Sequence, residues 1–146
     1  MEPAKMFIQF LQSSITPVAL ISGVGLILLS LTNRIGRTID RTRKLLTELR
    51  ITPKGREDII KSELKILHRR NRILKAAMGG IAFSILTSSL MIPVLLLMNI
   101  YQLDLRFLGS ALLILSISGI ILAAIYFFVD IVLSLKAIDF EMKELI

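Results

Sequence analysis

The sequence predicts an all-α, polytopic membrane protein with three transmembrane helices and a cytoplasmic antiparallel helical hairpin between the first and the second. Hydrophobic residues make up 54% of the 146 residues, charged residues make up 20%, and the charges are segregated along the chain. Residues 6–33, 76–103 and 107–129 contain no Asp, Glu, Lys or Arg, which gives stretches of 28, 28 and 23 residues. Each stretch exceeds the roughly 20 helical residues that cross about 30 Å of hydrocarbon. A soluble bundle would need a larger chain to cover three helices this apolar.

The basic residues predict the orientation. Of the 18 Lys and Arg, 14 lie in residues 34–75, directly after the first apolar stretch. Because basic flanks are retained on the cytoplasmic side, we expect a multi-pass protein of the bacterial inner (plasma) membrane, with its N-terminus outside and its C-terminus in the cytoplasm. This rule also accounts for the net charge of +7 without nucleic acid. Lys5 alone precedes the first apolar run, so we expect an uncleaved anchor and no signal peptide.

These patterns predict a single membrane domain over residues 1–146. Its transmembrane segments are expected at about 7–33, 76–100 and 107–132, and the hairpin at 34–75. Residues 2–12 fit a short interfacial helix, because their apolar residues recur at spacings of three and four. Pro17 leaves two interpretations open: it starts a new helix after Thr16, or it bends one long span.

The hairpin follows from two amphipathic stretches joined by turn residues. After Asn33 the helical period continues to about Arg50, with Ile35 and Ile39 on the apolar side. Residues 52–55 have the sequence of a turn, and the helical period resumes from residue 56 to residue 75. The simplest interpretation of the hairpin charges is a solvated exterior. A further role is docking on anionic inner-leaflet headgroups, at about 1 kcal/mol per near-surface charge. The candidate lipid contacts are Arg34, Arg37, Arg69, Arg70, Arg72 and Lys75.

The second and third spans carry stripes of small residues that favour close packing of helices in lipid. One stripe comprises Ala76, Gly80, Ser84, Thr87 and Ser88, and the other comprises Ser116, Gly119, Ala123, Tyr126, Asp130 and Ser134. Because an unpaired charge at mid-bilayer costs at least about 2.5 kcal/mol, we expect Asp130 to be paired or to face water. The cytoplasmic boundary favours Arg34 or Arg37 as its partner in an interhelical ion pair. A role in an ion pathway and a position already in water are the alternatives.

A third stripe follows the first helix into its basic segment. Small and hydroxyl residues lead into a series of arginines, which suits either a packing face or a water-filled pore between several copies. The stripe consists of Thr16, Ala19, Gly23, Ser30, Arg34, Arg37 and Arg41.

The sequence contains no pattern that predicts an enzyme, a metal site or a cofactor site. It has no cysteine, and its single histidine, His68, has no second His with which to form a dyad or a metal site. We find no P-loop, GxSxG or HExxH motif. We therefore expect a protein that is not an enzyme and has no cofactor.

One stretch resembles a known family. The run from Ser14 to Arg43 reads SITPVALISGVGLILLSLTNRIGRTIDRTR, and it is similar to the signature of the bacterial family called domain of unknown function 2721. Three spans around a charged loop also resemble the layout of that family. The resemblance implies no activity. It suggests only that a set of residues matters to the group: Thr16, Pro17, Asn33, Arg34, Arg37, Asp40 and Arg41.

Two functions remain as expectations. Three helices bury few of their own faces, so we expect a homo-oligomer. The first function is structural or interactive, with the basic hairpin binding anionic lipid or a partner at the inner membrane surface. The second is an oligomeric ion channel whose pore is lined by the first helix.

Overall fold

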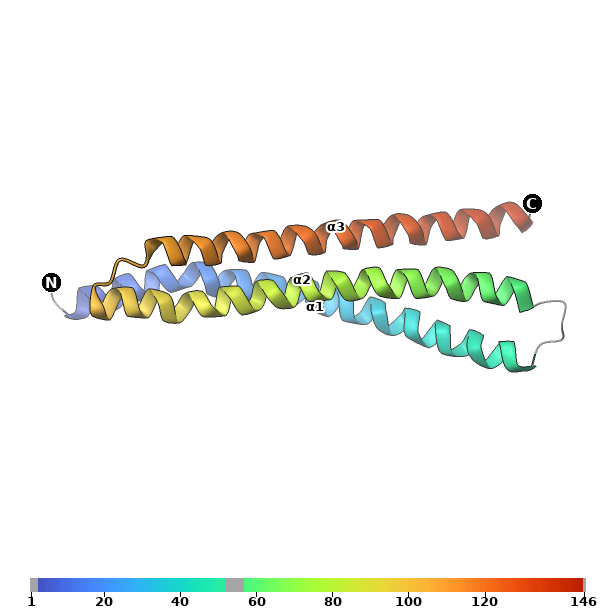
Figure 1. The fold of residues 1–146 in the computed structure, drawn as a ribbon, viewed down its shortest axis with the longest axis horizontal. Helices are drawn as coiled ribbons and strands as arrows, with labels where there is room; N and C mark the ends of the chain where they lie inside the picture. Colours follow the sequence, from blue (N-terminus) through green and yellow to red (C-terminus); the bar gives the residue numbers. More distant parts are fainter. Residues whose placement is uncertain (1–2, 52–56, 146) are drawn as a thin grey trace. The chain divides into compact units, whose positions relative to one another are not determined.

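The computed structural model describes residues 3–51 and 57–145, and places the side chains of residues 4–51 and 57–135. Three long helices occupy these ranges: α1 (Pro3–Ile51), α2 (Glu57–Tyr101) and α3 (Arg106–Leu145) (Figure 1). All three are long and apolar enough to cross a membrane, and each contains one of the predicted spans. The predicted all-α class with three such helices is therefore confirmed, whereas the predicted turn at residues 52–55 lies outside the described residues.

Helix α1 is continuous from Pro3 through Pro17 to Ile51, so the alternative in which a new helix starts at Pro17 is wrong. Residues 3–12 belong to this same helix, and their position at the membrane interface stays a prediction. Pro17 removes one backbone hydrogen bond but does not end the helix. In hydrocarbon, unwinding would leave several backbone groups unsatisfied, and a continuous helix loses only one of these bonds. The ring of Pro17 is buried.

Contacts divide the chain into two units, and each helix contributes to both. Unit 1 comprises Met1–Leu28 and Gly79–Leu122, and unit 2 comprises Leu29–Met78 and Ala123–Ile146. Along each helix one series of buried positions recurs every seven residues, which is the repeat of knobs-into-holes packing. The buried series are Pro17, Val24, Leu31, Thr38 and Leu45 in α1; Ile60, Leu67, Leu74, Ile81 and Ser88 in α2; and Gly109, Ser116, Ala123 and Asp130 in α3.

In unit 1, small residues bring α2 and α3 close together. Ser116 Oγ of α3 lies 2.9 Å from Ser84 Oγ and 2.6 Å from Ser88 Oγ, all three residues being buried. A Cβ placed on Gly119 would lie 2.8 Å from the carbonyl oxygen of Gly80, closer than a real Cβ atom is found. The two small-residue stripes of the second and third spans thus pack against each other within the chain.

The connection between α2 and α3 is short. Gln102 adopts the left-handed conformation (φ 53°) that commonly follows a helix C-terminus, and its side-chain amide donates to the carbonyl of Asn99 at 3.0 Å. The Asn99 amide donates in turn to the carbonyl of Met6 in α1, also at 3.0 Å. This bond joins the beginning of α1 to the end of α2.

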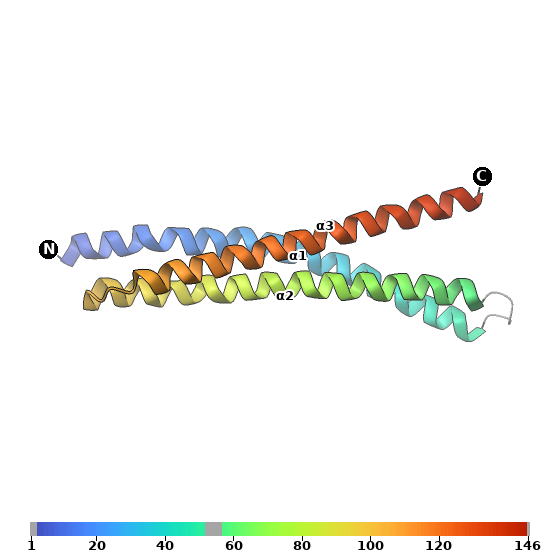
Figure 2. The ribbon, with the colours of Figure 1, turned by 45° about the horizontal axis from the view of Figure 1, so that its top comes forward.

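In unit 2, the end of α1 packs antiparallel to the beginning of α2, as both ribbon views show (Figures 1 and 2). Leu45 of α1 forms a core with Ile60 and Leu67 of α2. Nearer the middle of each helix, Thr38 Oγ1 lies 2.5 Å from Asn71 Oδ1. The predicted hairpin therefore has an apolar core of its own.

Candidate functional site

Asp130 is the most buried charged residue among the described side chains, with no exposed surface. It follows Ser116 and Ala123 at intervals of seven residues, so the packing of α3 directs it inward. Its Oδ1 accepts a hydrogen bond from Arg70 Nε of α2 at 3.0 Å, and its Oδ2 lies 2.8 Å from Arg34 Nε of α1. One carboxylate thus joins all three helices.

The two arginine contacts differ in geometry. Arg70 donates a well-directed hydrogen bond, whereas Arg34 approaches Oδ2 without hydrogen-bond alignment, and no described residue hydrogen-bonds that oxygen. The guanidinium of Arg34 also lies 5.3 Å from the ring centre of Phe127 on α3, which adds a cation–π attraction. Arg34 is therefore held by charge and by stacking, and Arg70 by a directed bond.

This cluster has a defined place along α1. Arg34 is the first charged residue after the 28-residue stretch without charges. Because Asp130 contacts Arg34, the carboxylate lies level with the end of the apolar part of α1. The side chains of Arg34 and Arg70 are 24% and 14% exposed, so the guanidinium groups keep limited access to the exterior while Asp130 has none. Pairing removes the large cost of burying the carboxylate alone.

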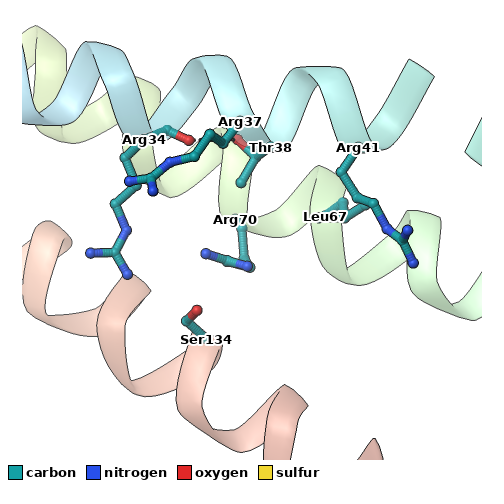
Figure 3. A pocket seen from close by; sticks show the side chains of 7 residues that line it. All are labelled: Arg34, Arg37, Thr38, Arg41, Leu67, Arg70 and Ser134. Atoms are coloured by element: carbon teal, nitrogen blue, oxygen red, sulfur yellow. Dashed lines mark hydrogen bonds between the residues drawn. The ribbon is translucent and has the colours of Figure 1, made fainter. Parts of the chain in front are cut away.

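A cavity of about 380 Å³ opens beside these arginines. It is lined by Arg34, Arg37, Thr38, Arg41, Leu67, Arg70 and Ser134. Figure 3 shows Arg34 and Arg70 reaching from α1 and α2 toward α3, with Arg37 lying along α1 beside Arg34. Four guanidinium groups line this arginine cavity, and none of its described lining residues is a carboxylate.

The described carboxylates around the arginine cavity neutralise only part of this charge. Glu63 Oε1 accepts from Arg41 at 2.7 and 3.0 Å, and Asp130 contacts Arg34 and Arg70. Arg37 is exposed and has no ion pair with any side chain that the structure describes. Among the described side chains, two carboxylates contact three of the four guanidinium groups, and this excess of positive charge suits an anion.

The structure therefore places Arg34, but not Arg37, on Asp130, and adds Arg70 as a second partner. Sequence reasoning assigned Arg70 only to the lipid-facing set. The signal was present, because Arg70 lies three residues after buried Leu67 and four before buried Leu74. That spacing puts its side chain on the buried side of α2, whereas Arg69, Arg72 and Lys75 are exposed.

The small residues of the stripe predicted on α1 face away from the other helices, whereas its arginines line the arginine cavity. Thr16, Ala19 and Gly23 are exposed within unit 1, and nothing lies within 4 Å of a Cβ built on Gly23. Ser30, Arg37 and Arg41 are exposed within unit 2, while Arg34 turns inward to Asp130. The small residues of the stripe are thus left exposed, while Arg34 and Arg41 join α1 to Asp130 of α3 and Glu63 of α2.

Neither a metal site nor a dyad is formed by the described residues. No group of three or more His, Asp or Glu side chains comes together among them, and His68 is exposed on α2. The chemistry that the arrangement offers is the electrostatic binding of an anion by guanidinium groups.

Comparison with known proteins places the chain in a family. No curated protein and no solved structure matches it. The model of one family matches residues 14–140, which include all of the arginine cavity and Asp130. The chain therefore belongs to the family described as protein of unknown function (DUF2721).

Proposed function

We propose that this chain is a homo-oligomeric integral membrane protein, without enzymatic activity, whose basic hairpin (residues 34–75) binds anionic lipid headgroups at the inner surface of a bacterial plasma membrane. The observation that carries the proposal is the arginine cavity at the end of the apolar part of α1. A headgroup phosphate is the anion that a bilayer presents at this depth. Arginine binds phosphate oxygens in a planar, bidentate geometry.

The distribution of charge supports the orientation. The hairpin contains 14 Lys and Arg but only five Asp and Glu, whereas the connection between α2 and α3 has Asp104 and is followed by Arg106, the first residue of α3. Basic excess on one side of three spans favours the cytoplasm for that side. The N-terminus would then lie outside and the C-terminus inside.

The α1 stripe supports association of copies. Ala19, Gly23 and Ser30 are small, exposed and without a packing role inside the chain. In lipid, such residues let helices from different copies approach closely. Ser84, Ser88, Ser116 and Gly119 of α2 and α3 already pack within the chain, so we propose α1 as the contact between copies.

The headgroup proposal can be tested by lipid binding to the purified, full-length protein. Binding of phosphatidylglycerol and phosphatidylcholine would be compared by native mass spectrometry. We expect a preference for phosphatidylglycerol that Arg37→Gln weakens roughly fivefold, because one near-surface charge contributes about 1 kcal/mol. Arg43→Gln is the matched control, since Arg43 is exposed on the same helix but does not line the arginine cavity. Equal binding of both lipids by the unchanged protein would refute the proposal.

The orientation has a separate test. The chain contains no cysteine, so Lys44→Cys creates a single thiol on the exposed side of the hairpin. We expect a membrane-impermeant maleimide to modify it in inverted vesicles and not in intact cells. Modification in intact cells would overturn the orientation.

A second candidate function is an oligomeric ion channel lined by α1. It is favoured by the exposure of Thr16 and Ser30 on the same side of α1 as Arg37 and Arg41, because hydroxyls leading to cations could line an aqueous path. The test is ion flux into liposomes containing the full-length protein, with Ser30→Trp expected to block it. Absence of flux in the unchanged protein would end this candidate.

A further inference from the structure

A second hollow in unit 2 lies on a different side of α2 from the arginine cavity. It measures about 680 Å³ and is lined by residues of α2 and α3. We call it the mixed groove, because its lining combines basic residues of α2 (Lys65, Arg69 and Arg72) with apolar residues of both helices (Ile73, Ile125 and Val129). Such a volume lies in the range of small-molecule sites.

The basic part of the mixed groove is unneutralised. Lys65, Arg69 and Arg72 follow one another at spacings of four and three, so they share one face of α2. All three are exposed, and none forms an ion pair with a side chain that the structure describes. The described residues of its lining include no carboxylate, and His68 adds a fourth nitrogen-bearing side chain. This part is therefore complementary to an anion.

The apolar part belongs to the end of the charge-free stretch of α3. Ile125 and Val129 are 54% and 39% exposed, although they lie only five residues and one residue before the buried Asp130. Because Asp130 is level with the end of the apolar part of α1, these residues lie on the hydrocarbon side of that level. Tyr126 also lines the groove, and its amphipathic ring suits the boundary between headgroups and acyl chains.

We propose that the mixed groove holds one anionic glycerophospholipid, with its phosphate on Arg69, Arg72 and Lys65 and one acyl chain along Ile125 and Val129 of α3. The inference rests on the proposed function, because the groove meets the inner leaflet only if the hairpin lies at that surface. A soluble anion would satisfy the charges but would make no use of the apolar wall. A neutral lipid would leave three cations without a partner. An anionic lipid matches both parts.

The chain has no tryptophan, so one introduced tryptophan can report on the lipid beside it. Tyr126→Trp places the reporter in the mixed groove, and Phe128→Trp places a matched reporter on an exposed part of α3 outside it. The full-length protein would be placed in phosphatidylcholine bilayers that contain a minority of phosphatidylglycerol. The bromine quencher would be attached to the acyl chains of either lipid in turn.

We expect brominated phosphatidylglycerol to quench Tyr126→Trp several times more strongly than its bulk fraction predicts, and Phe128→Trp only in proportion to that fraction. Adding Arg69→Gln and Arg72→Gln should weaken the preference roughly fivefold for each charge removed. Ile73→Phe, which narrows the groove without changing its charge, should also weaken the preference, whereas Ile59→Ala, on an exposed part of α2 that does not line the groove, should leave the preference nearly unchanged.

Several results would overturn the inference. Equal quenching of Tyr126→Trp by both brominated lipids would mean that the groove does not select an anionic lipid. Displacement by soluble glycerol phosphate would show an anion site without a role for the acyl chain. Failure of both lipids to quench Tyr126→Trp would mean that another protein surface covers the groove. If Arg37→Gln still alters the overall lipid preference in any of these cases, the proposed function stands and only the groove is wrong.

Discussion

Replacing Asp130 with asparagine tests whether one buried carboxylate holds the three helices together. Asp130→Asn keeps the shape of the side chain but leaves Arg34 and Arg70 as two positive charges without a counterion. Removing one partner of a buried ion pair costs about 3–5 kcal/mol. Because the two arginine side chains are 24% and 14% exposed and keep some solvation, we expect a loss of about 3 kcal/mol in the free energy of unfolding.

The cluster also predicts an order of effects. Arg70→Gln leaves Asp130 opposite Arg34, which is a neutral pair, so its cost should be close to that of one charge-assisted hydrogen bond, about 1.5–2 kcal/mol. Combining Asp130→Leu with Arg34→Met and Arg70→Met should recover most of the stability lost in Asp130→Leu alone, because buried ion clusters are often replaceable by apolar groups.

The assay is equilibrium unfolding of the purified protein in mixed micelles by titration with a denaturing detergent. Asp104→Asn is the matched control, since Asp104 is 82% exposed and lies 3.7 Å from Arg106, so its removal should change little. The reasoning is refuted if Asp130→Asn unfolds like the unchanged protein, or if Arg70→Gln is the more destabilising of the two.

Three further substitutions test the packing of the units, each measured by the same unfolding assay. Gly119→Ala should lower the free energy of unfolding by about 1–3 kcal/mol, because the added Cβ would lie 2.8 Å from a backbone oxygen. A Cβ added at Gly109 has no atom within 4 Å, so Gly109→Ala should leave the free energy of unfolding nearly unchanged. Ser116→Ala removes the contacts of Ser116 with two serines of α2 and should lower the free energy of unfolding by about 0.6–1.7 kcal/mol. An unchanged midpoint of the unfolding transition would show that these contacts contribute nothing to stability. Leu45→Ala should cost about 2–4 kcal/mol, and the 47% exposed Leu46→Ala less than about 1; similar losses in both would contradict the hairpin core.

The stripes show why spacing alone did not fix the packing. Ser116 and Gly119 were recognised as a packing face from their size and period, and they do meet α2. The same reasoning applied to Ala19 and Gly23 of α1 marks a face that is exposed in the chain. Small residues predict that a helix surface can be approached closely, but they do not predict which helix packs against it.

The seven-residue repeat was hidden for a related reason. In a soluble bundle the buried positions stand out as apolar among polar neighbours. Here the neighbours on the lipid side are apolar too, and several buried positions are polar or small, such as Thr38, Ser88 and Asp130. Hydrophobicity therefore carries no period across the spans, and the buried faces emerge only when the helices are packed.

The sequence alone determined the class of molecule. Three charge-free stretches longer than a bilayer crossing require helices, because backbone groups in hydrocarbon must bond within their own segment. The position of Asp130 at the end of the third apolar stretch likewise predicted a cationic partner, and several arginines near the membrane boundary were candidates. Only the tertiary structure decided that Arg70 shares the carboxylate with Arg34 while Arg37 lines an anion-suited cavity, because that choice depends on how helices distant in sequence are rotated against one another.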